Sequence, residues 1–136
     1  MGWVLCFAVL LLSTVDAAEL DMALLGQPPT TAWPTFNGDY TGERFSSLRQ
    51  INDSNVASLQ LQWSYRITDV AAQRGAPVPV IKATPLFVDG ILYFTIPNNV
   101  YAVDARTGTR LWTYSWVDQG GHLVGNRGLG MYKNGL

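Results

Sequence analysis

Cysteine is almost absent from this 136-residue sequence, which contains a single one, Cys6. Cys6 lies inside an apolar run at the start of the chain, whereas the cysteine of a lipoprotein follows such a run. One cysteine cannot form a disulfide within the chain, so a small scaffold held by disulfides is excluded.

An excess of charge of either sign is also lacking. Nine basic residues stand against ten acidic ones, and the formal net charge is -1. No basic cluster is present, so we expect no nucleic-acid partner. The sequence also contains no Walker loop, no dinucleotide-binding fingerprint and no nucleophile elbow, which argues against the enzyme classes that depend on them.

Long apolar runs are limited to one, residues 3–12 at the N-terminus. Ten apolar residues suit the hydrophobic region of a secretory signal and are too few to cross a bilayer. Ala17 supplies a small residue for cleavage, although a basic segment before the run is absent. We expect a signal peptide at residues 1–18, and a buried N-terminal strand or helix is the alternative. The predicted location is periplasmic or secreted, with association with the outer face of the inner membrane as an option.

Aromatic residues are abundant, with five Trp, six Tyr and five Phe, which favours an all-β protein. Residues 59–67 alternate apolar and polar side chains without exception, and we expect a strand there. The apolar positions that share one face are Leu59, Leu61, Trp63, Tyr65 and Ile67. Residues 19–32, by contrast, contain a Pro-Pro pair and are expected to form an extended N-terminal arm.

Apolar runs separated by turn residues predict four further short strands. The expected strands cover residues 86–88, 91–95 and 100–103, and a fourth begins at Leu111. The Asp89-Gly90 pair between two of these runs is the strongest hairpin signal in the sequence. No segment between the strands has room for a helix, so a βαβ arrangement is excluded.

Residues 102–112 combine a strand end, a tight turn and the start of another strand. Asp104 is placed to accept hydrogen bonds from backbone N–H groups just after it, and Gly108 supplies a positive φ. Trp112 is large enough to join one sheet to its neighbour. Trp63 lies 49 positions before Trp112, and each is followed two residues later by Tyr. This period and the four strands indicate β-propeller blades.

The chain is short for a closed propeller. At roughly 40–50 residues per blade, it has room for two to three blades, whereas a closed propeller needs at least about four. We therefore expect residues 33–136 to be the N-terminal part of a truncated propeller domain.

The pattern Ala-x-Asp-x-x-Thr-Gly-x-x-x-Trp at residues 102–112 resembles the tryptophan-docking motif of quinoprotein dehydrogenases. These proteins are β-propellers that carry pyrroloquinoline quinone (PQQ). Residues 33–48, rich in aromatics and in Asn-Gly and Thr-Gly turns, resemble the opening segment of the quinoprotein alcohol dehydrogenases. The resemblance implies an all-β partial β-propeller, about two blades of an eight-bladed parent. It also implies an exported PQQ-dependent alcohol dehydrogenase, of which this piece alone is expected to be inactive.

A different function uses the same repeats. Some propellers with tryptophan-docking repeats are cofactor-free scaffolds that bind other proteins, and this alternative stays open. For the enzyme, the resemblance implies PQQ together with a calcium or lanthanide ion, whose ligands are expected outside this chain. It also implies a small alcohol as substrate, and a periplasmic electron acceptor such as a cytochrome c or a quinone.

Three of the four candidate cofactor-binding residues follow the predicted blade. Residues 120–130 include five glycines, which allow a flat ligand to approach the backbone closely. Asn126-Arg127-Gly128 resembles the segment in which an arginine of this family contacts PQQ, which implies that Arg127 binds the cofactor and Asn126 supports it. Pairing of Arg127 with a carboxylate between blades is the alternative interpretation.

Two positions depart from the family pattern. Gly121-His122 stand where the alcohol dehydrogenases have adjacent cysteines, and Lys82 stands where many members have a cofactor-contacting glutamate. His122 either covers the face of the cofactor or is part of the loop structure. Lys82 either pairs with a PQQ carboxylate or is a solvated charge.

Overall fold

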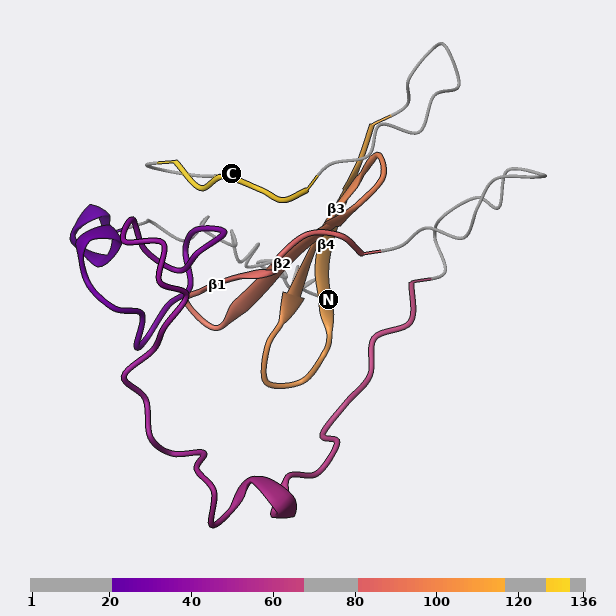
Figure 1. The fold of residues 1–136 in the computed structure, drawn as a ribbon. Coiled ribbons are helices and arrows are strands. Elements are labelled where there is room, and N and C mark those ends of the chain that lie inside the picture. Colours follow the sequence, from indigo (N-terminus) through magenta and orange to yellow (C-terminus); the bar gives the residue numbers. More distant parts are fainter. Residues whose placement is uncertain (1–20, 68–80, 117–126, 133–136) are drawn as a thin grey trace, which may run out of the picture.

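The computed structural model describes residues 21–67, 81–116 and 127–132 (Figure 1). Its centre is one antiparallel sheet in the order β1-β2-β3-β4. The strands are β1 (Leu86–Val88), β2 (Ile91–Ile96), β3 (Asn99–Asp104) and β4 (Arg110–Ser115). The predicted blade is therefore confirmed, and each predicted strand boundary agrees with the structure to within one residue. The predicted signal peptide, residues 1–18, lies outside the described residues.

Short turns hold these strands in register. Asp89 and Gly90 have φ values of 49° and 77°, the pair of positive φ angles that a tight two-residue hairpin requires. Asn98 also has a positive φ, 61°, in the turn between β2 and β3. Because successive strands are joined so directly, each pairs with its sequence neighbour and the sheet is a simple meander.

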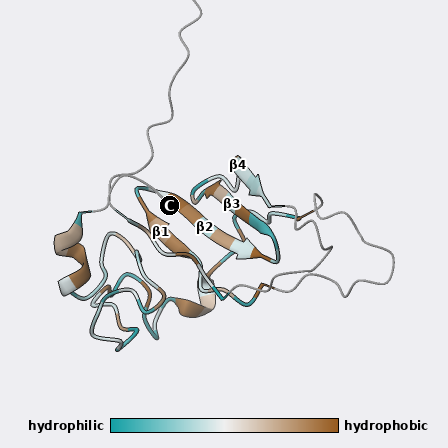
Figure 2. Cartoon of the chain, turned by 90° about the horizontal axis from the view of Figure 1, so that it is seen from above, coloured by the Kyte–Doolittle hydropathy of each residue, from teal (hydrophilic) through white to brown (hydrophobic). Residues whose placement is uncertain are grey.

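The two faces of the sheet are covered by different segments. On the first face, Tyr93 lies opposite Ala102, and both belong to the buried cluster that Leu86 and Val88 complete. The residues packed against this cluster are Ala32, Ile91, Trp112, Leu129 and Met131. The second face carries Phe94 opposite Tyr101, and the ring of Tyr65 meets both of them edge-on. Figure 2 shows β1 and β2 largely hydrophobic and β4 paler, in line with the exposure of four of the six β4 residues.

The segment before the sheet is partly helical. A 3-10 helix, η1 (Met22–Gly26), begins after Asp21, whose carboxylate accepts a hydrogen bond from the Ala23 N–H. The prediction of a wholly extended arm over residues 19–32 is therefore wrong, because the Asp21 cap stabilises a helical turn before the Pro-Pro pair. Leu25 of this helix is buried, and its carbonyl accepts a hydrogen bond from the Tyr40 N–H. The helix is thereby tied to the aromatic-rich segment that follows it.

That aromatic-rich segment adds one residue to the edge of the sheet. Trp33 and Phe87 form an antiparallel bridge in which each backbone N–H donates to the other's carbonyl, at 2.6 and 3.0 Å. The segment then runs away from the sheet to a second 3-10 helix, η2 (Val56–Ser58), before it returns (Figure 1). Over residues 21–67, 81–116 and 127–132, no helix combines the length and the apolar character needed to cross a membrane.

The strand predicted at residues 59–67 is not formed, and that prediction is wrong. Trp63, Tyr65 and Ile67 are half-buried, as the alternation indicates, whereas Leu59 and Leu61 are 61% and 84% exposed. Alternation reports which side chains share a face, but a strand also needs a backbone partner. No other described segment of the protein forms backbone pairs with residues 59–67. This segment therefore lies against the sheet without taking part in its hydrogen-bond ladders.

Candidate functional site

The turn between β3 and β4 is organised by one carboxylate. The Asp104 Oδ1 atom accepts hydrogen bonds from the Arg106 N–H (3.0 Å), the Thr107 N–H (2.8 Å) and the Thr107 hydroxyl (2.9 Å). The bonds from Thr107, and then that from Arg106, lower the pKa of Asp104 below its ordinary value. The predicted turn is confirmed, since φ at Gly108 is also positive, 73°.

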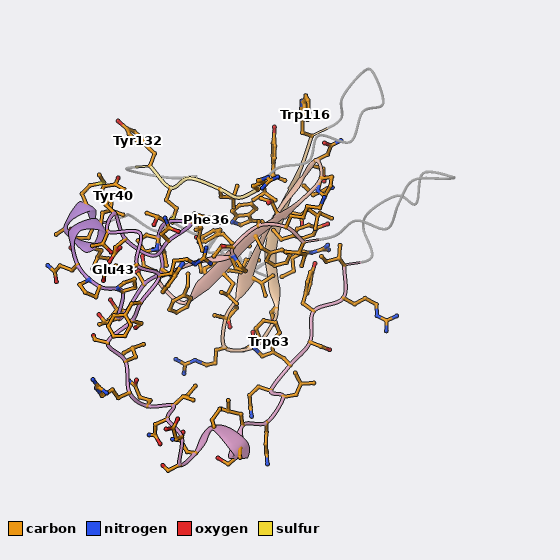
Figure 3. The ribbon with its side chains drawn as sticks, viewed as in Figure 1. Phe36, Tyr40, Glu43, Trp63, Trp116 and Tyr132 are labelled. Carbon is orange, nitrogen blue, oxygen red and sulfur yellow. The ribbon has the colours of Figure 1, made fainter. Side chains whose placement is uncertain are left out.

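Trp63 docks on this same turn. Its indole Nε1–H donates to the Ala105 carbonyl at 3.1 Å, and its ring covers Gly108 (Figure 3). A Cβ atom at position 108 would lie 2.6 Å from the ring, closer than real Cβ contacts. Position 108 therefore requires glycine for two reasons, its positive φ and the close approach of the indole. The sequence predicted the turn, but not that Trp63 would pack on it.

Trp112 occupies the repeat position equivalent to Trp63 but contacts its own sheet. Its ring lies 5.9 Å from that of Tyr93, centroid to centroid, and packs against the buried cluster of the first face. The expectation that Trp112 joins this sheet to a neighbour stays a prediction. Trp63, by contrast, attaches the segment of residues 59–67, which forms no strand, to the turn between β3 and β4.

The segment leading into β1 holds the first candidate cofactor residue, Lys82, which is exposed. Two residues later, the Thr84 hydroxyl accepts a long hydrogen bond of 3.4 Å from Arg44 Nη2. The Arg44 guanidinium also lies over the Phe36 ring, 4.8 Å from its centroid. Arg44 thus places a second cation near this segment, a residue that the sequence-based interpretation missed. The aromatic at Phe36 was visible in the sequence, but its pairing with Arg44 depends on the intervening turns.

The second candidate, Arg127, opens the segment of residues 127–132. Its side chain is exposed, and within residues 21–67, 81–116 and 127–132 it has no hydrogen bond or ion pair. The carboxylate partner of the alternative interpretation is thus not found in the described part of the chain. Leu129 and Met131, which follow at alternate positions, pack on the first face of the sheet. The other two candidates, His122 and Asn126, lie outside the described residues.

A metal centre is not assembled in the part of the chain that the structure describes. No group of three or more His, Cys, Asp or Glu side chains there is arranged to hold an ion. The Asp104 carboxylate is occupied by hydrogen bonds within its own turn. That the metal ligands lie in other blades stays a prediction.

Comparisons with known proteins agree with this geometry. Residues 33–135 match the family described as glucose/ethanol/alcohol dehydrogenase, beta-propeller domain. The match covers the aromatic-rich segment, the docked Trp63, the sheet and the Arg127 segment. The chain therefore belongs to the PQQ-dependent, or quinoprotein, alcohol dehydrogenase family.

The names of individual relatives are consistent with this family. The chain is 40% identical over 128 residues to the quinohemoprotein alcohol dehydrogenase of Comamonas testosteroni, covering 89% of this chain and 17% of that protein. It is 45% identical over 83 residues to a 1-butanol dehydrogenase (cytochrome c) of Thauera butanivorans, covering 60% of this chain and 11% of that protein.

Solved structures show the same fold. The crystal structure of the Comamonas testosteroni enzyme matches with a TM-score of 0.51 at 44% identity, over 62% of this chain and 12% of that one. A europium-containing methanol dehydrogenase matches with a TM-score of 0.55 at 29% identity, over 73% of this chain and 16% of that one. The chain thus spans less than a fifth of the length of these relatives.

Proposed function

We propose that this chain is the N-terminal portion of an exported quinoprotein dehydrogenase that oxidises an alcohol with PQQ and a bound metal ion. Here "complete protein" means the product of the whole gene that encodes this chain. The observation that carries the proposal is the state of Arg127, an exposed guanidinium without a described partner, next to two side chains packed on the blade. The names of the relatives, which are alcohol and methanol dehydrogenases, support the reaction class.

The residues present fit the chemistry of the cofactor. PQQ is a flat quinone that carries several carboxylates, and a guanidinium fork matches a carboxylate with two parallel hydrogen bonds. Arg127 would bind one such group and orient the ring, and the exposed ammonium of Lys82 would neutralise another. When bound, PQQ supplies the two-electron acceptor for alcohol oxidation. His122 and Asn126 remain proposed cofactor contacts on the basis of the sequence.

The remaining partners are proposed from the family. A calcium or lanthanide ion beside the quinone would act as a Lewis acid, and its ligands would come from other blades. The electron acceptor would be a periplasmic cytochrome c or quinone, which is supported by relatives whose names specify cytochrome c or quinone. Export through the predicted signal peptide would place the enzyme in the periplasm or outside the cell.

Titration of PQQ into the complete protein tests the role of Arg127. Arg127→Ala is expected to weaken PQQ binding about 100-fold, the scale of losing one charged hydrogen-bonded pair. Arg49→Ala removes an exposed arginine on the segment before η2 and serves as the matched control, with unchanged affinity expected. Equal affinity of the wild type and Arg127→Ala would contradict the assignment. Complete absence of PQQ binding in the wild type would favour the cofactor-free scaffold.

A further inference from the structure

Arg127 itself makes no described contact that fixes its position, yet it lies at the start of an anchored segment. Leu129 and Met131 are half-buried against the cluster on the first face of the sheet. The buried cluster that receives them consists of Leu86, Val88, Tyr93 and Ala102. Two contacts at alternate positions fix both the position and the rotation of a short stretch of chain, because a shift by one residue would turn both side chains away.

The two glycines next to these anchors cannot help to attach the segment. Gly128 and Gly130 have no side chains, and a Cβ atom at either position would meet nothing within 4 Å. Leu129 and Met131 are therefore the side chains that attach this stretch to the first face of the blade. Arg127 is two residues from Leu129, at most ~7 Å along the chain, so its backbone is held with them.

We propose that Leu129 and Met131 are positioning residues for Arg127. They hold its backbone on the blade before the cofactor binds, so the segment does not have to be ordered when the guanidinium meets the cofactor carboxylate. This inference rests on the proposed function, since it takes Arg127 as a PQQ ligand. A guanidinium on an unanchored segment would have to be ordered when the ligand binds, and that ordering weakens affinity. The anchors act through Arg127 and do not touch the cofactor themselves.

A double-mutant cycle on PQQ affinity in the complete protein tests this inference. Leu129→Ala and Met131→Ala are each expected to weaken PQQ binding about 10-fold. In the Arg127→Ala background, the same truncations are expected to change affinity less than about twofold, because the group they position is already gone. Met131→Leu nearly keeps the side-chain volume, and this variant is expected to retain the wild-type affinity for PQQ.

Controls separate positioning from general loss of structure. Leu61→Ala makes the same truncation at a side chain that is 84% exposed, and it should leave PQQ affinity unchanged. If Leu129→Ala does not fold, Leu129→Val provides the milder truncation for the same cycle. Circular dichroism and the melting temperature are recorded for each variant.

The outcomes distinguish this inference from the proposed function. If the Leu129 and Met131 truncations weaken binding equally with and without Arg127, their role is merely structural and the inference is overturned. It is also overturned if they leave affinity unchanged while Arg127→Ala weakens it. If Arg127→Ala itself has no effect, the assignment of Arg127 as a cofactor ligand fails first, and the positioning role fails with it.

Discussion

Two short segments cover the two faces of the same sheet, and they are attached in different ways. Residues 63–67 lie on the second face, where the Trp63 indole donates a hydrogen bond to the Ala105 carbonyl and its ring covers Gly108. Residues 127–132 lie on the first face through two flexible apolar side chains, Leu129 and Met131. The first attachment is directional and fits one backbone geometry, whereas the second depends on apolar burial.

The difference indicates how each segment will tolerate substitution. The Trp63 ring lies directly on Gly108 and is hydrogen-bonded to the Ala105 carbonyl, so a substitution at either Trp63 or Gly108 disrupts the contact. Apolar contacts with a flat cluster accept other side chains of similar volume. Trp63 and Gly108 should therefore be the sensitive positions for stability, and the 127–132 segment should be sensitive mainly through the placement of Arg127.

The largest loss of stability is expected for Trp63→Ala. The substitution removes a half-buried indole, its contact with Gly108 and its hydrogen bond to Ala105, and it should lower the free energy of unfolding by about 3 kcal/mol. Urea unfolding of the complete protein, followed by circular dichroism, measures the effect. A loss below about 0.5 kcal/mol would show that the indole is not docked in solution.

Gly108→Ala should rank second, with a loss of about 2 kcal/mol. The new methyl group would meet the Trp63 ring at 2.6 Å, and alanine resists the φ of 73°. Gly130→Ala in the other segment is the matched control, because a Cβ atom there has open space. The comparison between the segments breaks down if both substitutions cost the same in urea unfolding.

Trp63→Phe divides the docking contact into its parts. Phenylalanine keeps an aromatic ring near Gly108 but cannot donate to the Ala105 carbonyl, so a loss of about 1 kcal/mol is expected. Measured beside Trp63→Ala, this variant reports how much of the attachment is directional. A value equal to that of Trp63→Ala would mean that a phenyl ring cannot replace the indole in this contact.

The smallest effect, and one that depends on pH, is expected for Asp104→Asn. The lowered pKa of Asp104 means that its ionised form stabilises the turn, so this contribution is complete above the ordinary value of 3.8. It is lost as the pH falls from there through the lowered pKa, because the carboxylate becomes protonated. Melting temperatures of wild type and variant should therefore differ at neutral pH and converge in acid. A gap that persists at the lowest pH would contradict the role of the charge.

Local sequence signals predicted the sheet well. The turns at Asp89-Gly90 and Asp104–Gly108 depend on residues a few positions apart, and the side chains that form them can be read directly from the sequence. The periodicity of residues 59–67 correctly indicated that Trp63, Tyr65 and Ile67 share the half-buried side of this segment. It could not indicate the absence of a backbone partner, which is a property of the surrounding chain.

Contacts between distant residues could not be predicted in the same way. Arg44 reaches Thr84, forty positions later, and Trp63 reaches Ala105, forty-two positions later. Neither pairing has a local pattern. For the candidate site, the sequence indicated Lys82 and Arg127 by resemblance. It did not indicate that Leu129 and Met131 would attach the Arg127 segment to the sheet.

The single bridge between Trp33 and Phe87 has a consequence for solubility. β1 is an edge strand of only three residues, and unpaired N–H and C=O groups on such an edge invite strand addition from another molecule. Trp33 forms hydrogen bonds with the outward-facing N–H and C=O groups of Phe87, so the edge is already paired at its middle residue. A protein shortened to begin after Trp33 would present that edge to its neighbours, and aggregation, not loss of any functional group, would be its first defect.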